Sequence, residues 1–197
     1  IPFALAPNDL NLANTFMQLM KAGNMDVTRT HTTPWNKLWM GAADKNGIGV
    51  SFEGTWPWLM IHSTPLPDAK LIEMWKGEFL LKKYRNHPSL LFWTVNNEMK
   101  FYDNDNDLER AKEKYRVISD VVKEMRRIDP TRPICFDSNY QAKGKDKKFG
   151  TDFMNSIDDG DIDDMHGYYN WYDFSVFRFF NGEFQERYKM PDRPLIS

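Results

Sequence analysis

The sequence predicts an α/β fold of the (β/α)8 or TIM-barrel type, and two observations predict it. Segments with helical periodicity alternate with short apolar runs along the 197 residues, a pattern that favours parallel strands joined by right-handed crossovers. Chemically active side chains also follow the apolar runs, as they do at the carboxyl ends of barrel strands. These side chains are Arg29, His31, Glu53, Glu98, Asp137, His166 and Tyr168.

A doubly wound nucleotide-binding sheet would show the same alternation of helices and strands. That architecture requires a glycine-rich turn after a strand, because backbone N–H groups must approach the phosphates closely. Neither G-x-G-x-x-G nor G-x-x-x-x-G-K-[ST] occurs in the sequence. The barrel is therefore the preferred prediction.

The first third of the chain predicts two pairs of a helix and a strand. Residues 11–22 carry apolar side chains at helical spacing and end at a glycine, which is typical of a helix C-terminus. A short strand at 25–30 follows. Residues 36–45 repeat the helical spacing, and an Asn-Gly pair separates them from the apolar run at 48–52.

The middle of the chain continues the alternation. A helix is predicted over 67–84, and it must end before Pro88 because the residue before a proline is disfavoured in helical geometry. The apolar run 90–95 predicts a buried strand. Asp107 is placed to cap the clearest amphipathic helix of the chain, and residues 134–136 predict the next strand.

The last third is more polar. Residues 138–160 predict a long surface loop with solvated lysines and at most one helical turn, at 153–156. Residues 162–168 predict a strand, 174–188 an irregular aromatic helical segment, and 195–197 the last strand.

Composition excludes several classes of function. The 26 basic and 28 acidic residues nearly cancel, and no basic face is interleaved with aromatics, so nucleic acid is not an expected partner. A single cysteine excludes an internal disulfide, and no Cys or His cluster has zinc-ligand spacing. No apolar run is long enough for a membrane span. These observations leave the cell compartment, cytoplasmic or exported, open.

Two acidic segments have some features of calcium loops. The segment Asp103–Asp107 lacks the glycine and the distal glutamate of the EF-hand pattern. The segment Asp158–Asp164 contains a glycine but lacks the alternating spacing of ligands. A solvated loop that caps the next helix and an acidic turn are the preferred interpretations.

Glu98 is the strongest candidate for a catalytic residue. It follows a predicted core strand, beside the amides of Asn96 and Asn97. A partly desolvated glutamate at a barrel mouth can have the raised pKa that a proton donor needs. Spacing alone leaves an ordinary loop carboxylate as an open alternative.

A resemblance to a known family favours the catalytic interpretation. The run Y-R-N-H-P-S-L-L-F-W-T-V-N-N-E at residues 84–98 closely resembles the R-N-H-P-S-(hydrophobic)-W-(S/T)-x-x-N-E signature of glycoside hydrolase family 2. That family includes β-galactosidases, β-glucuronidases and β-mannosidases. The resemblance implies a retaining glycosidase in which Glu98 is the general acid/base and the Asn97 amide binds the sugar 2-hydroxyl.

Segments around two earlier strands also resemble the family. Residues 19–34 are similar to its second-strand segment, which implies that Arg29 helps to hold the nucleophile. His31 lies one place before the usual histidine, so sugar binding and hydrogen bonding to strand-end carbonyls both remain open. Residues 42–54 are similar to the third-strand segment, in which Glu53 either binds substrate hydroxyls or forms an ion pair with Arg29.

Aromatic residues are the one compositional excess, at 15% with seven tryptophans. Core packing accounts for most of them, and sugar stacking is another reason for exposed rings. Trp56 and Trp58 could stack on a sugar or anchor their loop. Residues 164–172 are similar to the sixth-strand pattern of β-glucuronidase-like members, which implies that Tyr168 binds and tunes the nucleophile. His166 stands where those members often carry asparagine.

A retaining mechanism needs a second carboxylate close to the first. The ending R-P-L-I-S at 193–197 resembles the context just before the family's nucleophile, so a glutamate is expected directly after Ser197. The chain begins without methionine, and we expect residues 1–197 to be one catalytic barrel domain cut at both ends. It would hold about strands two to seven, lie beside flanking β-sandwich domains, and be inactive without the nucleophile.

The resulting prediction is a glycosidase that acts on a β-linked carbohydrate and uses no metal or organic cofactor in bond cleavage. Two alternatives remain open at this point. One is another retaining barrel glycosidase, such as an endo-mannanase or a cellulase. The other is a barrel that binds carbohydrate without catalysis.

Overall fold

The strands in the described part of the chain are all parallel and follow one another in chain order. The computed structural model describes residues 7–31, 34–53, 80–98, 107–166 and 189–196. Within these ranges one sheet has the order β1-β2-β3-β4, and β5 pairs with β6. An isolated parallel bridge between Cys135 and Ile162 connects the two groups of strands. The strands are β1 (Val27–Arg29), β2 (Gly49–Glu53), β3 (Leu90–Thr94), β4 (Ile134–Cys135), β5 (Asp163–Asp164) and β6 (Leu195–Ile196).

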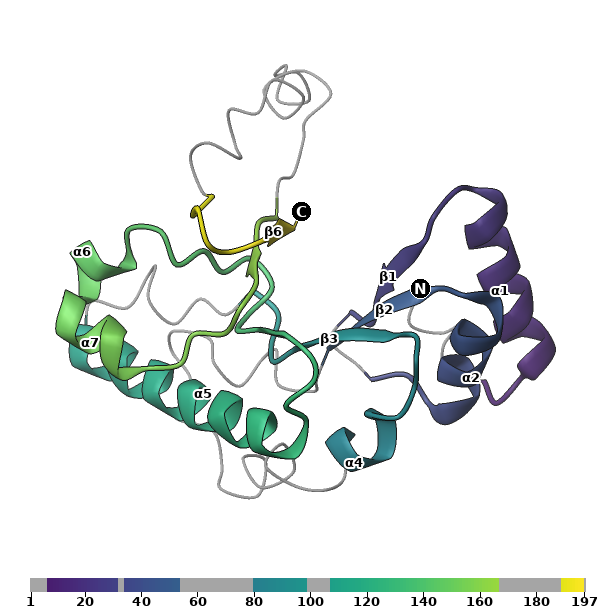
Figure 1. The fold of residues 1–197 in the computed structure, drawn as a ribbon, viewed down its shortest axis with the longest axis horizontal. Coiled ribbons are helices and arrows are strands. Elements are labelled where there is room, and N and C mark those ends of the chain that lie inside the picture. The colour runs from purple at the N-terminus through teal and green to yellow at the C-terminus, as the bar shows by residue number, and fades with distance from the viewer. Residues whose placement is uncertain (1–6, 32–33, 54–79, 99–106, 167–188, 197) are drawn as a thin grey trace, which may run out of the picture.

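Helices flank these strands, as expected for a barrel. Figure 1 shows α1 and α2 side by side at one end of the molecule, with α6 and α7 beside α5 at the other. In the part of the chain that the structure describes, no helix is long and apolar enough to cross a membrane. The helices are α1 (Leu10–Ala22), α2 (Lys37–Asn46), α4 (Leu80–Tyr84), α5 (Leu108–Ile128), α6 (Lys145–Phe149) and α7 (Thr151–Ser156).

The ends of the predicted helices have clear local causes. Asp9, Asn36 and Asp107 precede α1, α2 and α5, and each side chain accepts a hydrogen bond from a backbone N–H of the first turn. Gly47 ends α2 with φ +69°, a left-handed conformation in which glycine carries no steric penalty. The predictions of these three helices are confirmed.

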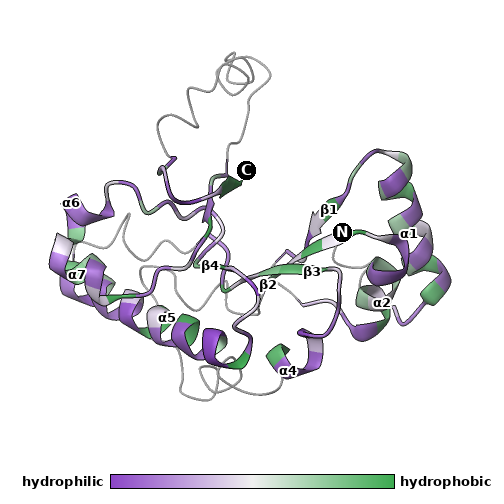
Figure 2. Cartoon of the chain, in the orientation of Figure 1, coloured by the Kyte–Doolittle hydropathy of each residue, from purple (hydrophilic) through white to green (hydrophobic). Residues whose placement is uncertain are grey.

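The core lies between the outer face of the sheet and the helices. Figure 2 shows apolar residues concentrated along β2 and β3, whereas the helices carry many hydrophilic ones. Phe52 of β2 packs edge-on against Trp93 of β3, with ring centroids 5.5 Å apart. The Trp93 indole is fully buried and donates to Asp129 Oδ2 at 2.9 Å, so its one polar group is satisfied.

The R-N-H-P-S turn anchors the start of β3 to α2. Asp44 of α2 accepts a hydrogen bond from the backbone N–H of Ser89 at 2.9 Å and one from its hydroxyl at 2.5 Å. Its other oxygen lies 2.6 Å from His87 Nδ1. Burial alone would raise the pKa of Asp44, but the hydrogen bonds from Ser89 and His87 outweigh burial and lower it. The R-N-H-P-S part of the signature therefore fixes the amino end of β3, whereas Glu98 follows its carboxyl end.

The predicted loop at 138–160 is wrong in one respect, because it contains two helices, α6 and α7, where one turn was predicted. Its aromatic residues explain the difference. Tyr140 and Phe149 are buried, and both rings pack against Tyr115 of α5. Short helices with little amphipathic pattern are thus stabilised by tertiary packing. The predicted helical residues 67–79 and 174–188 lie outside the described residues.

The acidic turn is held by ion pairs. Arg126 of α5 binds Asp158 at 2.6 Å and Asp161 at 2.8 Å. Arg193, just before β6, binds Asp159 at 2.9 Å and the buried Asp163 at 2.8 Å. The turn therefore connects α5 to the strand pair β5 and β6.

Candidate active site

Glu98 lies at the carboxyl edge of the sheet because β3 and β4 continue to pair beyond their regular ends. The backbone N–H of Ser138 donates to the Asn96 carbonyl at 3.0 Å, and the N–H of Glu98 donates to the Ser138 carbonyl at 2.9 Å. At Glu98 the backbone turns into the left-handed region, with φ +49°. This conformation is uncommon for a residue other than glycine and is characteristic of functional sites.

Arg29 connects three other strand ends. Its Nε lies 3.3 Å from Oε2 of Glu53, at the end of β2, and the Glu53 side chain is fully buried. Its second terminal nitrogen donates to Asn97 Oδ1 at 3.1 Å. Its first lies 2.9 Å from Nε2 of His166, after β5. The ion pair considered for Glu53 is therefore present, and a single guanidinium links residues from β1, β2, β3 and β5.

The amide of Asn97 is oriented by its oxygen. Oδ1 accepts hydrogen bonds from Arg29 and, at 2.8 Å, from the Ser138 hydroxyl. Both partners are donors to this atom, which identifies it as the oxygen rather than the nitrogen of the amide. The amide nitrogen therefore points away from Arg29 and from the Ser138 hydroxyl.

Glu98 has a specific partner in His166. Oε1 of Glu98 lies 2.7 Å from Nδ1 of His166. The His166 backbone N–H donates to Asn139 Oδ1 at 3.1 Å, and Asn139 itself has φ +77°. The preceding N–H, of Met165, donates to the Ile196 carbonyl at 2.9 Å. Residues from three segments therefore fix the position of this histidine.

Two further titratable groups lie beside this cluster. Asp164 is buried, and burial raises the pKa of its carboxyl, although the positive charge of the neighbouring Arg29 opposes the shift. His31 is exposed at the end of β1. Partial burial and the Arg29 guanidinium lower the pKa of His31.

The structure brings together Glu98, Asn97, Arg29, Glu53 and His166 of the predicted site, with His31 nearby. Three more predicted site residues, Trp56, Trp58 and Tyr168, lie outside the described residues. Sequence reasoning missed Ser138 and Asn139, which position Asn97 and His166. Their place two and three residues after the predicted strand 134–136 was the available signal.

A cavity of about 630 Å³ adjoins the cluster on the inner face of the strands. Arg29, Asp164 and His166 line its polar side. Leu91 and Phe92 line its apolar side together, because β3 has one extra residue here: Val50 pairs with Leu90, but Ser51 pairs with Phe92. The irregularity turns two consecutive apolar side chains toward the cavity.

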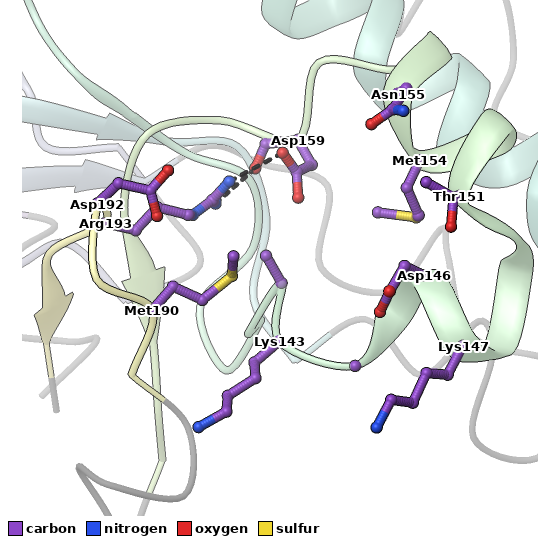
Figure 3. A pocket seen from close by; sticks show the side chains of 12 residues that line it. Lys143, Asp146, Lys147, Thr151, Met154, Asn155, Asp159, Met190, Asp192 and Arg193 are labelled. Carbon is purple, nitrogen blue, oxygen red and sulfur yellow. Dashed lines mark hydrogen bonds and ion pairs between the residues drawn. The ribbon is translucent and has the colours of Figure 1, made fainter.

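A second cavity, of about 590 Å³, lies between α6, α7 and the turn before β6. Figure 3 shows Lys143 and Lys147 at its rim and the ion pair between Asp159 and Arg193 along one wall. None of the predicted site residues that the structure describes lines it. The candidate active site is therefore the cluster around Glu98.

Parallel strands in barrel order, with polar side chains gathered at their carboxyl edge, define a domain of the TIM-barrel class. Residues 9–197 match the family model described as glycosyl hydrolases family 2, TIM barrel domain. The chain belongs to this family.

Similar proteins are larger than this chain. A β-galactosidase from Halalkalibacterium halodurans is 26% identical over 142 residues, which make up 66% of this chain and 13% of that protein. A β-glucuronidase structure from Bacteroides uniformis has a TM-score of 0.70 at 18% identity and covers 95% of this chain and 22% of its own. One from Parabacteroides merdae has a TM-score of 0.65 at 15% identity, covering 95% and 21%. The chain thus spans about a fifth of these structures, which support its fold.

Proposed function

We propose that the full-length protein hydrolyses β-glycosides with retention of configuration, and that Glu98 is its general acid/base. The observation that carries the proposal is the place of the Glu98 carboxylate. It lies at the carboxyl edge of β3, directly after Asn97 and 2.7 Å from His166 Nδ1. Membership of glycosyl hydrolases family 2 supports the same chemistry.

The reaction proceeds in two steps. In the first, a nucleophilic carboxylate attacks the anomeric carbon, the bond to the leaving oxygen breaks, and protonated Glu98 gives its proton to that oxygen. In the second, water attacks the anomeric carbon of the glycosyl ester and passes a proton to Glu98, and the nucleophile leaves as a carboxylate. The same side chain is an acid and then a base.

Asn97 is proposed to donate to the sugar hydroxyl next to the anomeric carbon. Its amide oxygen already accepts hydrogen bonds from Arg29 and Ser138. The amide N–H groups are therefore the part of the side chain that is oriented toward a ligand. In glycosidases, substrate distortion and hydrogen bonds to the 2-hydroxyl that strengthen in the transition state together lower the barrier by roughly several kcal/mol. We expect the Asn97 amide to supply part of that stabilisation.

The nucleophile is proposed to be a glutamate at the position after Ser197. The register of β5 and β6 supports this, since Asp164 pairs with Ile196 and the backbone N–H of Met165 donates to the Ile196 carbonyl. Continued for two residues, that register sets position 198 level with His166, the partner of Glu98. Tyr168 would hydrogen-bond this nucleophile, Trp56 or Trp58 would stack on the sugar, and flanking β-sandwich domains would complete the protein.

The test is Glu98→Gln in the full-length protein, with Glu109→Gln as the matched control. Glu109 lies on the exposed first turn of α5 and pairs with Lys112. On an aryl glycoside with a poor leaving group, Glu98→Gln should lower turnover by about 10²- to 10⁴-fold, the usual contribution of general acid–base catalysis. Glu109→Gln should keep wild-type turnover.

Azide provides a second measurement on the same variant. Azide attacks a glycosyl ester without a general base, so it should accelerate Glu98→Gln on an activated aryl glycoside and give a glycosyl azide of retained configuration. Unchanged turnover in Glu98→Gln would contradict the assignment of Glu98 as the general acid/base. A residue other than a carboxylate after Ser197 would contradict the proposed nucleophile.

A further inference from the structure

We infer that His166 is the positioning residue of the acid/base: Arg29 holds it as the neutral imidazole with its proton on Nδ1, and that N–H orients the Glu98 carboxyl. This inference rests on the proposed function of Glu98. It starts from one chain of contacts, from the Arg29 guanidinium to Nε2 of His166 at 2.9 Å and from Nδ1 to Oε1 of Glu98 at 2.7 Å.

The protonation state of His166 follows from the hydrogen-bonding capacity of its partners. A guanidinium has only N–H donors and cannot accept a hydrogen bond. Nε2 of His166 must therefore present its lone pair to Arg29. The Oδ2 atom of Asp164 lies 3.8 Å from Nε2, beyond hydrogen-bond distance, so it does not require a proton on that nitrogen. A neutral imidazole carries one N–H, so the proton is on Nδ1 and is donated to Glu98.

The tautomer determines the role of each Glu98 oxygen. Oε1 accepts from Nδ1 whether the carboxyl is ionised or protonated, because an acid carbonyl oxygen is also an acceptor. A proton on Oε1 would face the proton on Nδ1. The acidic proton is therefore carried by Oε2, and His166 determines which oxygen gives it to the leaving group.

The geometry of His166 is rigid enough for this role. Its backbone N–H is held by Asn139, and its side chain is 14% exposed. The guanidinium that fixes the ring is held in turn by the buried Glu53 and by Asn97. A catalytic carboxyl is effective only if its supporting groups fix its direction.

The charged groups around Glu98 set the direction of the expected pH effect. Arg29 and His31 face the site from the end of β1, Glu53 from β2, and Asp164 from β5 together with His166. A donor on Oε1 stabilises the carboxylate more than the neutral acid. Loss of the donor therefore moves the alkaline limb of kcat/KM, which reports loss of the acidic proton, to higher pH.

The experiment compares three substitutions of His166 in the full-length protein. Asparagine places an N–H donor near the position of Nδ1, glutamine places its amide near Nε2, and alanine removes both. On aryl glycosides with weakly acidic phenols, His166→Ala and His166→Gln should lower kcat/KM by about tenfold to a hundredfold, the effect of one hydrogen bond to a charged group. His166→Asn should recover most of the activity.

The leaving group separates positioning from simple destabilisation. A strongly acidic phenol departs without protonation, so His166→Ala should remain near wild type on that substrate. His87→Ala is the matched control, because its Nδ1 also contacts a carboxylate, Asp44, at 2.6 Å, but at the other end of β3. His87→Ala should change neither the alkaline limb of kcat/KM nor the dependence of kcat/KM on the leaving group. His87→Asn replaces it as the control if the alanine variant does not fold.

Two results would overturn the inference. One is an equal loss on good and poor leaving groups in His166→Ala with the alkaline limb unmoved. The other is recovery by glutamine as complete as by asparagine. If Glu98→Gln loses activity only on substrates with poor leaving groups, these results reject the role of His166 but leave the acid/base assignment of Glu98 intact. If Glu98→Gln is fully active, the acid/base assignment itself fails.

Discussion

Arg29→Met should show how much the Arg29–Glu53 ion pair contributes to the free energy of unfolding. The side chain of Glu53 is fully buried, 3.3 Å from Arg29 Nε, whereas 27% of the Arg29 side chain is exposed. Removing one partner of a buried ion pair costs about 3–5 kcal/mol, because the remaining charge stays desolvated. Since water reaches part of the guanidinium, we expect the lower end, about 3 kcal/mol of unfolding free energy.

A double-mutant cycle isolates the ion pair. Glu53→Gln alone leaves Arg29 partly hydrated, so it should cost about 1 kcal/mol. The double variant Arg29→Met/Glu53→Gln should be less destabilised than the sum of the two by about 2 kcal/mol, within the usual range for residues in contact.

Hydrogen–deuterium exchange of the full-length protein measures this locally. Peptides that span β1 to β3 report the free energy of opening of these strands even within a larger protein. A loss of about 3 kcal/mol corresponds to roughly 100-fold faster exchange. Additive costs in the double variant would refute the reasoning, because they would mean that Arg29 and Glu53 contribute independently.

Two other perturbations act at a distance from Glu98. Asp44→Ala should lower the unfolding free energy by about 2 kcal/mol at neutral pH, because His87 and the backbone N–H and hydroxyl of Ser89 lose their hydrogen-bond partner. The folded-state pKa of Asp44 is lowered, so this stability is present above about pH 4 and is lost as the pH falls through the folded pKa. The difference between the wild-type and variant melting temperatures should therefore shrink in acid. A difference that stays constant with pH would contradict the role of the Asp44 carboxylate. Gly160→Ala and Gly144→Ala both place alanine at φ +82°, but a Cβ at Gly160 would lie 2.5 Å from a backbone carbonyl oxygen, whereas one at Gly144 meets no described atom within 4 Å. Gly144→Ala should cost about 1 kcal/mol and Gly160→Ala clearly more, and equal melting temperatures would exclude the steric explanation.

The spacing of apolar residues predicted the helices whose buried face can be recognised from their own sequence. Helix α5 is the clearest case, because Asp107 caps it and its apolar stripe matches the buried side. The same pattern could not predict α6 and α7, which have five and six residues. Their stability comes from Phe149 and Phe153 packing on Tyr115, a contact between residues far apart in the chain.

The site was predictable to the level of strand ends. Because parallel strands present their carboxyl ends at one edge, Arg29, Glu53, Glu98 and His166 were expected together, and the structure brings them together. Pairing within the cluster was not predictable. The orientation of the His166 ring depends on its contacts with Glu98 and Arg29 and on the hydrogen bond that its backbone N–H donates to Asn139 Oδ1, contacts between residues far apart in the chain.

The left-handed backbone at Glu98 has an evolutionary consequence. A glutamate at φ +49° costs on the order of 1 kcal/mol relative to a residue that tolerates this conformation, such as glycine or asparagine. Selection for stability alone would therefore remove the glutamate from this corner. The proposed acid/base role accounts for its presence, because that role requires a carboxylate at the mouth of the barrel despite the less stable fold.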